Sequence, residues 1–274
     1  SSYEKAAILT IDGVGEWATA SICHGEGNKI TVLKELDFPH SLGLLYSAFT
    51  YYCGFKVNSG EYKLMGLAPY GNHGSPQVKK FVDIIKSSLV DLKEDGSIFL
   101  NQEYFNYATG LRMVYDDKWE KLFGFPRRRS ESQLEQHHCD LALAIQEVTE
   151  EAVLNLGREA KKLTGADYLC MAGGVALNCV ANGKLDDAKL FKQIFIQPAA
   201  RDAGGALGAA YAAHHIYFGN ERKVDPAKLD TLKGSYLGTE HSDMDILTVA
   251  KKYRADYENY DDEDALLEKV ASLI

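Results

Sequence analysis

The chain opens with short apolar runs separated by glycine-containing turns. Residues 6–11 form a continuous apolar run that predicts a buried strand, and residues 17–23 and 29–36 predict two more. Pro39 interrupts the pattern, and residues 42–53 then place apolar side chains at helical spacing. Two hairpins followed by a helix are therefore expected.

The pattern changes further along the chain. Residues 58–130 are less regular, with a predicted helix at 77–89 and a predicted hairpin near residue 95. We interpret them as an inserted segment that shapes one wall of a site. Residues 134–163 then repeat apolar positions at three- and four-residue steps, which predicts a long amphipathic helix.

Two glycine-rich turns follow this helix. One contains Gly173 and Gly174, and the other spans residues 197–208; each follows a short apolar run and leads into an alanine-rich segment. Strand, glycine turn and helix together aim backbone N–H groups and a helix dipole at a phosphate. Asn178 and Asp202 are the polar groups beside these turns. Paired glycines also permit tight connections without a ligand, but two such turns in consecutive units favour a binding site.

Composition narrows the class of protein. The 274 residues are 46% hydrophobic with a net charge of -9, which suits one or two globular domains and argues against general nucleic-acid binding. Five scattered cysteines without a CxxC pair favour a reducing compartment. No apolar run is long enough to span a bilayer, so we expect a cytoplasmic protein with no membrane or nucleic-acid partner. The histidine pairs 137–138 and 214–215 point to different helix sides, so we expect surface or cap roles.

The predicted order of elements indicates an α/β fold. Three strands and a helix, followed by two strand–turn–helix units, is the order of a ribonuclease-H-like lobe, here with an inserted α+β segment. Actin, Hsp70 and sugar kinases clamp ATP between two such lobes. In that arrangement the turn formed by Gly13, Val14 and Gly15 would hold phosphate, and Gly173 and Gly174 would hold adenosine.

Four motifs resemble a known family. Residues 11–17 (IDGVGEW), 38–71, 172–178 and 197–210 resemble, in this order, the carbamoyltransferases related to nodulation protein U and the antibiotic O-carbamoyltransferases. The resemblance covers nearly the whole chain. It implies that carbamoyl phosphate and ATP react to give carbamoyladenylate, whose carbamoyl group passes to a small-molecule or saccharide hydroxyl.

The resemblance also implies a domain organisation. The family combines a large domain, similar to the universal tRNA threonylcarbamoyladenosine-forming protein, with a smaller domain resembling YrdC. Residues 1–240 would be the second lobe of the large domain, with the insertion at about 58–130. Residues 241–274 would connect to the YrdC-like domain or begin it. The first lobe and most of the YrdC-like domain would lie outside this chain, and we expect the chain alone to be inactive.

The family binds an iron-type divalent metal through two histidines of an HxxxH helix and two aspartates. Asp12 and Asp202 match the aspartates, whereas no pair of histidines here has the HxxxH spacing. The resemblance therefore places that helix upstream of this chain. Arg201 stands where the family usually has glycine. The residues implied to contact nucleotide are Gly13, Val14 and Gly15 at the phosphates, Gly60 and Lys63 at the ribose, and Gly173, Gly174 and Asn178 at the nucleoside.

Three alternatives remain open at this point. The first is the tRNA threonylcarbamoyladenosine-type modification activity, which shares the fold, although a net charge of -9 offers little for tRNA. The second is a nucleotide-binding regulatory module without chemistry. The third is a sugar-kinase-like transferase that uses the same lobe. The sequence defines neither the acceptor nor the oligomeric state.

Overall fold

A computed structural model describes residues 1–225 and 232–274. The chain divides into two compact units, Ser1–Thr231 and Leu232–Ile274. The first unit contains a five-stranded sheet of order β3-β2-β1-β6-β7 and a two-stranded sheet, β4-β5. The strands are β1 (Lys5–Ile11), β2 (Ala18–Glu26), β3 (Lys29–Asp37), β4 (Val90–Leu92), β5 (Ile98–Leu100), β6 (Tyr168–Ala172) and β7 (Gln193–Ile196).

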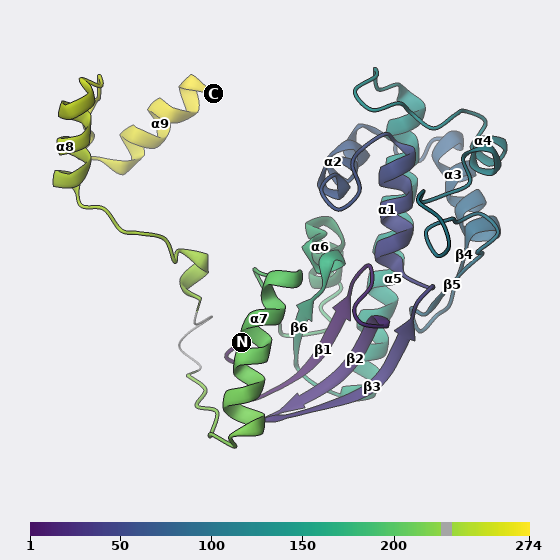
Figure 1. The fold of residues 1–274 in the computed structure, drawn as a ribbon, viewed down its shortest axis with the longest axis horizontal. Coiled ribbons are helices and arrows are strands. Elements are labelled where there is room, and N and C mark those ends of the chain that lie inside the picture. The colour runs from purple at the N-terminus through teal and green to yellow at the C-terminus, as the bar shows by residue number, and fades with distance from the viewer. Residues whose placement is uncertain (226–231) are drawn as a thin grey trace. The chain divides into compact units, whose positions relative to one another are not determined.

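The larger sheet mixes two strand directions. β2 is antiparallel to both β1 and β3, whereas β6 is parallel to β1 and β7 is parallel to β6. The three strands and the two hairpins predicted at the start of the chain are confirmed, as is the hairpin of β4 and β5. Because β1, β6 and β7 run in the same direction, the turns that follow them gather at one edge of the sheet (Figure 1).

The first unit also contains helices, of which α5 (Gln136–Thr164) packs against β1 and β2. The α-helices are α1 (Leu42–Tyr52), α2 (Glu61–Leu67), α3 (Pro76–Ile84), α4 (Asp116–Phe123), α5 (Gln136–Thr164), α6 (Cys179–Asp187) and α7 (Asp202–Tyr211). Shorter helical turns are η1 (Ala68–Tyr70), η2 (Ile85–Leu89), η3 (Gly174–Leu177) and η4 (Ala212–Tyr217).

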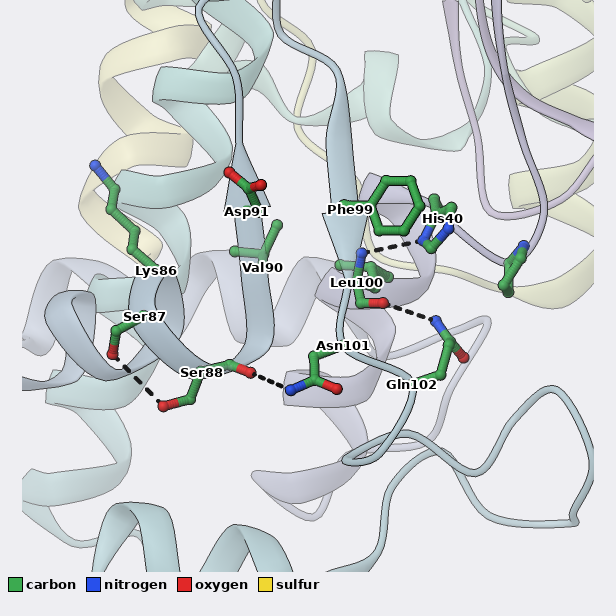
Figure 2. Close-up of a pocket in the computed structure, with 11 residues that line it drawn as sticks. His40, Lys86, Ser87, Ser88, Val90, Asp91, Phe99, Leu100, Asn101 and Gln102 are labelled. Atoms are coloured by element: carbon green, nitrogen blue, oxygen red, sulfur yellow. Dashed lines mark hydrogen bonds between the residues drawn. The ribbon is translucent and has the colours of Figure 1, made fainter.

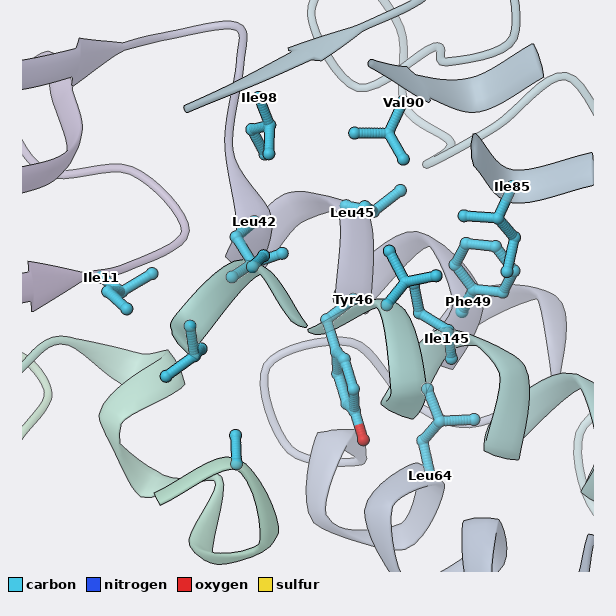
Figure 3. Packing of buried hydrophobic residues seen from close by; sticks show 14 of the residues in the cluster. Ile11, Leu42, Leu45, Tyr46, Phe49, Leu64, Ile85, Val90, Ile98 and Ile145 are labelled. Carbon is cyan, nitrogen blue, oxygen red and sulfur yellow. The ribbon is translucent and has the colours of Figure 1, made fainter. Parts of the chain in front are cut away.

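The long helix α5 organises the hydrophobic core. It packs against β1 and β2 and also contacts α1, α3 and α6. Leu45 and Phe49 of α1 and Ile145 of α5 are fully buried, and Figure 3 shows them converging. Val90 and Ile98 of the β4-β5 hairpin belong to the same buried cluster. The insertion is thus held to the sheet by a shared core.

Two helices of the insertion, α2 and α4, were missed by the sequence pattern. α4 buries only Trp119 and Phe123 along its length, which gives too few apolar positions to establish a helical period. The indole Nε1 of Trp119 donates to the Tyr104 carbonyl at 3.0 Å. Phe123 and Phe125 lie near this indole and the Tyr52 ring, forming a local aromatic core.

His137 and His138 lie in the first turn of α5, and the His138 side chain takes part in the capping box at its N-terminus. The backbone N–H of Glu135 donates to His138 Nδ1 at 3.0 Å, while the Glu135 side chain accepts from the His138 N–H. Burial, His137 and the Arg128 charge lower the pKa of His138 to about 4, against a smaller opposing effect of Glu135. The cap therefore needs an unprotonated Nδ1, and the predicted cap role is confirmed.

We expect this cap to make stability depend on pH. Because the pKa of folded His138 lies below its usual value of 6.5, the unfolded chain binds more protons between pH 6.5 and 4. Stability should fall as pH falls through that window, by on the order of 1 kcal/mol. Urea unfolding across this range should show a flatter dependence for His138→Gln than for wild type. His73→Gln, at an exposed position, is the matched control, and equal slopes for the two variants would contradict the assignment.

The second unit contains α8 (Asp243–Tyr253), α9 (Glu263–Leu273) and the short turn η5 (Lys233–Ser235). Ser242 and Asp245 form a capping box at the start of α8. Within residues 1–225 and 232–274, no helix combines the length and apolar character needed to cross a bilayer.

Candidate functional site

Asp12 follows β1 and is the best-anchored of the predicted site residues. Its Oδ1 accepts hydrogen bonds from the backbone N–H of Gly13 at 2.8 Å and of Gly174 at 3.1 Å. Ser41 Oγ donates to the carbonyls of Asp12 and Gly13 at 3.0 and 2.6 Å. The two turns predicted to bind nucleotide are therefore joined through one carboxylate.

Gly173, in the turn after β6, also contacts the turn after β7. Its N–H donates to the Ala200 carbonyl at 2.8 Å. The residue has φ +93°, and a Cβ added there would lie 2.2 Å from the Ile11 carbonyl oxygen. Only glycine fits this close approach of two backbones. The turns after β1, β6 and β7 thus meet at one edge of the sheet.

Most backbone donors of the turn after β1 already have partners. The Gly13 N–H bonds to Asp12, and the Gly15 N–H donates to the Ala18 carbonyl at 3.0 Å. Val14 is 44% exposed, and its N–H has no partner within the described residues. Space beside Gly13 is open, since an added Cβ would meet nothing within 4 Å. A ligand can approach this turn, but it finds few free amides there.

Asn178 lies at the start of α6 and faces inward. Its Oδ1 accepts from the Ala181 N–H at 3.0 Å, and its amide exchanges two hydrogen bonds with Gln146 of α5 at 3.0 and 3.1 Å. Tyr46 of α1 donates to Gln146 Oε1 at 3.0 Å, and burial raises the pKa of that tyrosine. Asn178, predicted to line the nucleoside, is engaged in fixing the η3–α6 turn. Sequence reasoning missed Gln146 and Tyr46 because both sit within ordinary helix patterns.

Gly60 and Lys63 lie at the start of α2. Gly60 is buried and caps the helix, and the Lys63 side chain is exposed. The loop before α2 is held by Glu61, whose carboxylate accepts from the Asn58 N–H at 2.9 Å and the Gly60 N–H at 3.1 Å. Arg201 Nη1 donates to the Asn58 carbonyl at 3.3 Å, which links this loop to the turn before α7.

Asp202 is the first residue of α7 and is exposed. α7 buries none of its residues, and its continuation η4 is held by Asn28, whose amide donates to the His215 carbonyl at 3.2 Å. Among the residues that the structure describes, no three His, Cys, Asp or Glu side chains gather in a way that could hold a metal ion. The described residues therefore do not complete a metal site by themselves.

Comparison with known proteins identifies the family. Residues 1–211 match the family described as Carbamoyltransferase N-terminus. The chain belongs to this carbamoyltransferase family. It is 55% identical to the uncharacterized protein sll1178 of Synechocystis over 100% of this chain and 43% of that protein. It is 37% identical to nodulation protein NolNO of Sinorhizobium fredii and 35% identical to nodulation protein NolO of Bradyrhizobium diazoefficiens, each over 77% of this chain.

The chain spans less than half the length of these relatives. The matched parts are 43% of the cyanobacterial protein, 28% of NolNO and 35% of NolO. The family match ends at Tyr211, the last residue of α7. All ten residues predicted to contact metal or nucleotide thus lie within the matched part.

A separate pocket of about 590 Å³ lies beside the β4-β5 hairpin (Figure 2). Its lining includes His40, whose Nδ1 accepts from the Leu100 N–H at 3.1 Å and whose ring lies 3.8 Å from that of Phe99. Burial lowers the pKa of His40. None of the predicted site residues lines this pocket. Two residues connect His40 to the turn after β1: its neighbour Ser41 donates to the Asp12 carbonyl, and Thr19 donates to the His40 carbonyl and accepts from the Asp12 N–H.

Proposed function

We propose that the full-length protein is an ATP-dependent O-carbamoyltransferase that uses carbamoyl phosphate and a hydroxyl acceptor. The observation that carries the proposal is the convergence of Asp12 and the Gly173–Gly174 turn, joined by the hydrogen bond from Gly174 to Asp12 Oδ1 at 3.1 Å. Membership of the carbamoyltransferase family supports the transferred group. The strand order β3-β2-β1-β6-β7, with β2 antiparallel to its neighbours, supports a ribonuclease-H-like lobe of the actin, Hsp70 and sugar-kinase type.

We also infer that the functional protein extends beyond this lobe. Residues 1–240 would form the second lobe of the large domain, and residues 241–274 would lead into a YrdC-like domain. The partial coverage of the relatives supports this inference, since the chain matches only 28–43% of their lengths. The chain alone would then lack half of the nucleotide clamp and show no turnover.

The proposed reaction has two steps. Carbamoyl phosphate, ATP and one water give carbamoyladenylate, pyrophosphate and inorganic phosphate. The acceptor hydroxyl then attacks the carbamoyl carbon, loses its proton and displaces AMP. In this scheme the open space beside Gly13 receives the nucleotide phosphates. Asp12 holds the turns after β1 and β6 in register, so that phosphate and nucleoside are bound at fixed positions.

A divalent metal, with iron expected from the resemblance, would supply charge neutralisation at the phosphates. We propose that Asp12 and Asp202 contribute its carboxylate ligands. Within residues 1–225 and 232–274 no three His, Cys, Asp or Glu side chains gather to hold a metal ion, and the resemblance would place two histidine ligands upstream of this chain. No step of the reaction is assigned to the metal for that reason.

The metal assignment makes a direct prediction. Asp202 is exposed, and α7 has no side-chain hydrogen bond at its N-cap, so Asp202→Ala should leave the fold intact. In the full-length protein it should abolish stoichiometric metal binding, measured by elemental analysis after gel filtration. Asp187→Ala, which removes an exposed carboxylate from α6, is the matched control. Metal content equal in the two variants would remove Asp202 from the site.

The reaction itself is tested by following pyrophosphate. Full-length protein should release pyrophosphate from ATP only when carbamoyl phosphate is present, and a carbamoylated acceptor should appear with AMP. A phosphorylated product would instead indicate kinase-like chemistry on the same lobe. ATP turnover without any dependence on carbamoyl phosphate would overturn the proposed function.

A further inference from the structure

Arg201 places its guanidinium between two of the predicted nucleotide-binding turns. Nη1 donates to the Asn58 carbonyl at 3.3 Å, ahead of α2. Nε lies 4.0 Å from the position that a Cβ on Gly174 would occupy, and Asp12 Oδ1 lies 3.1 Å from that same position. The side chain therefore passes over Gly174, beside the Asp12 carboxylate.

The acceptor that steadies this arginine is itself fixed. Asn58 has a left-handed backbone with φ 67°, and its N–H bonds to Glu61 Oε1 at 2.9 Å. Ser47 Oγ of α1 donates to the same oxygen at 2.7 Å. The Asn58 carbonyl is thus held in a defined direction, and one edge of the guanidinium is pre-oriented by it. Pre-orientation lowers the entropy lost when a side chain binds a ligand.

Among the described residues, only one N–H donor of the Arg201 guanidinium has a hydrogen-bond partner. Within residues 1–225 and 232–274 it forms no ion pair with a carboxylate, although Asp12 lies nearby. A guanidinium has five N–H donors and matches the oxygens of a phosphate in a two-pronged arrangement. The donors not used by Asn58 are therefore available to an anion at this edge of the sheet.

A cation near Gly174 would compensate for the shortage of free amides and for the negative charge beside it. Of the amides in the turn after β1, those of Gly13 and Gly15 are already bonded within the protein. The Asp12 carboxylate adds negative charge beside Gly174. A guanidinium that faces the phosphates would offset this repulsion in addition to the proposed metal.

We propose that Arg201 binds a phosphate oxygen of the nucleotide, bridging it to the Asn58 loop. The proposal rests on the proposed function for its ligand. It assigns to Arg201 a phosphate contact that the turn amides cannot fully supply. The competing role is purely structural, in which Arg201 only ties the Asn58 loop to the turn before α7.

Binding of phosphate-bearing and phosphate-free ligands separates these roles. Calorimetry on full-length protein should show that Arg201→Gln weakens ATP and pyrophosphate binding by about tenfold or more, with adenosine binding unchanged. Arg201→Lys, which keeps the charge but not the fork, should lose less. Arg129→Gln removes an exposed arginine elsewhere and should have no effect. Thermal melts of all variants establish that each is folded.

The outcomes distinguish failure of the Arg201–phosphate contact from failure of the proposed function. Equal weakening of ATP and adenosine binding, or no weakening of either, would overturn the phosphate contact and leave the proposed function standing. A wild-type protein that binds pyrophosphate in an Arg201-dependent way but does not bind ATP would overturn the nucleotide function and retain the anion contact. Wild-type protein that binds neither ATP nor pyrophosphate would overturn both.

Discussion

Gly173→Ala should unfold this protein at a much lower urea concentration than wild type. The residue has φ +93°, and a Cβ there would lie 2.2 Å from the Ile11 carbonyl oxygen and 2.6 Å from its carbon. Both contacts are with the backbone of β1, which cannot move without disrupting the centre of the sheet. Backbone strain and overpacking together predict a loss of about 3 kcal/mol or more in the free energy of unfolding.

Gly205→Ala provides the matched control. Gly205 lies inside α7, and an added Cβ would meet nothing within 4 Å. Alanine is favoured over glycine within a helix by up to about 1 kcal/mol, so this variant should be as stable as wild type or slightly more so. Equal stability of the Gly173 and Gly205 variants would show that β1 and the turn after β6 do not approach each other as described. The glycine-to-alanine change therefore tests the close backbone approach at Gly173 and helix propensity at Gly205.

The features that could be predicted from the sequence are those determined by residues close together along the chain. The strands at residues 5–11 and 18–26 follow from short apolar stretches beside glycine turns, and the strand at 29–37 follows from alternation of apolar and polar residues. The α5 helix follows from a sustained apolar period. Gly173 was singled out as part of a glycine turn expected to contact the nucleoside, and the structure shows that this residue also allows close approach to the carbonyl of Ile11. Asp12 was singled out as a site residue from motif and order.

The features that sequence reasoning missed depend on contacts between distant residues. Glutamine at position 146 fits an ordinary helix face, yet its amide pairs with that of Asn178, 32 residues away. Arg201 departs from the family pattern, and its contact with Asn58 joins residues 143 positions apart. A pattern confined to neighbouring residues carries no information about such pairs. Helices α2 and α4 were missed for the simpler reason that each is too short to establish a period.

Asp12→Asn should separate the structural role of this residue from its role in chemistry. Asparagine retains an Oδ1 that can accept from the Gly13 and Gly174 N–H groups, which now bond to the carboxylate at 2.8 and 3.1 Å. We therefore expect the variant to lose about 1 kcal/mol or less in the free energy of unfolding. The negative charge is lost, so carbamoyl transfer by the full-length protein should fall by roughly a hundredfold or more.

Asp12→Ala completes this comparison. Alanine removes the acceptor as well as the charge and leaves two part-buried backbone N–H groups without a partner, which should cost about 2 kcal/mol or more. Transfer activity should fall at least as far as in Asp12→Asn, because the charge is absent from both and alanine also removes the acceptor that joins the two turns. Urea unfolding and product formation measured on the same preparations test the two expectations together. An Asn variant with near-normal transfer would mean that Asp12 only holds the turns after β1 and β6 together, and the metal and phosphate chemistry would then have to depend on other groups.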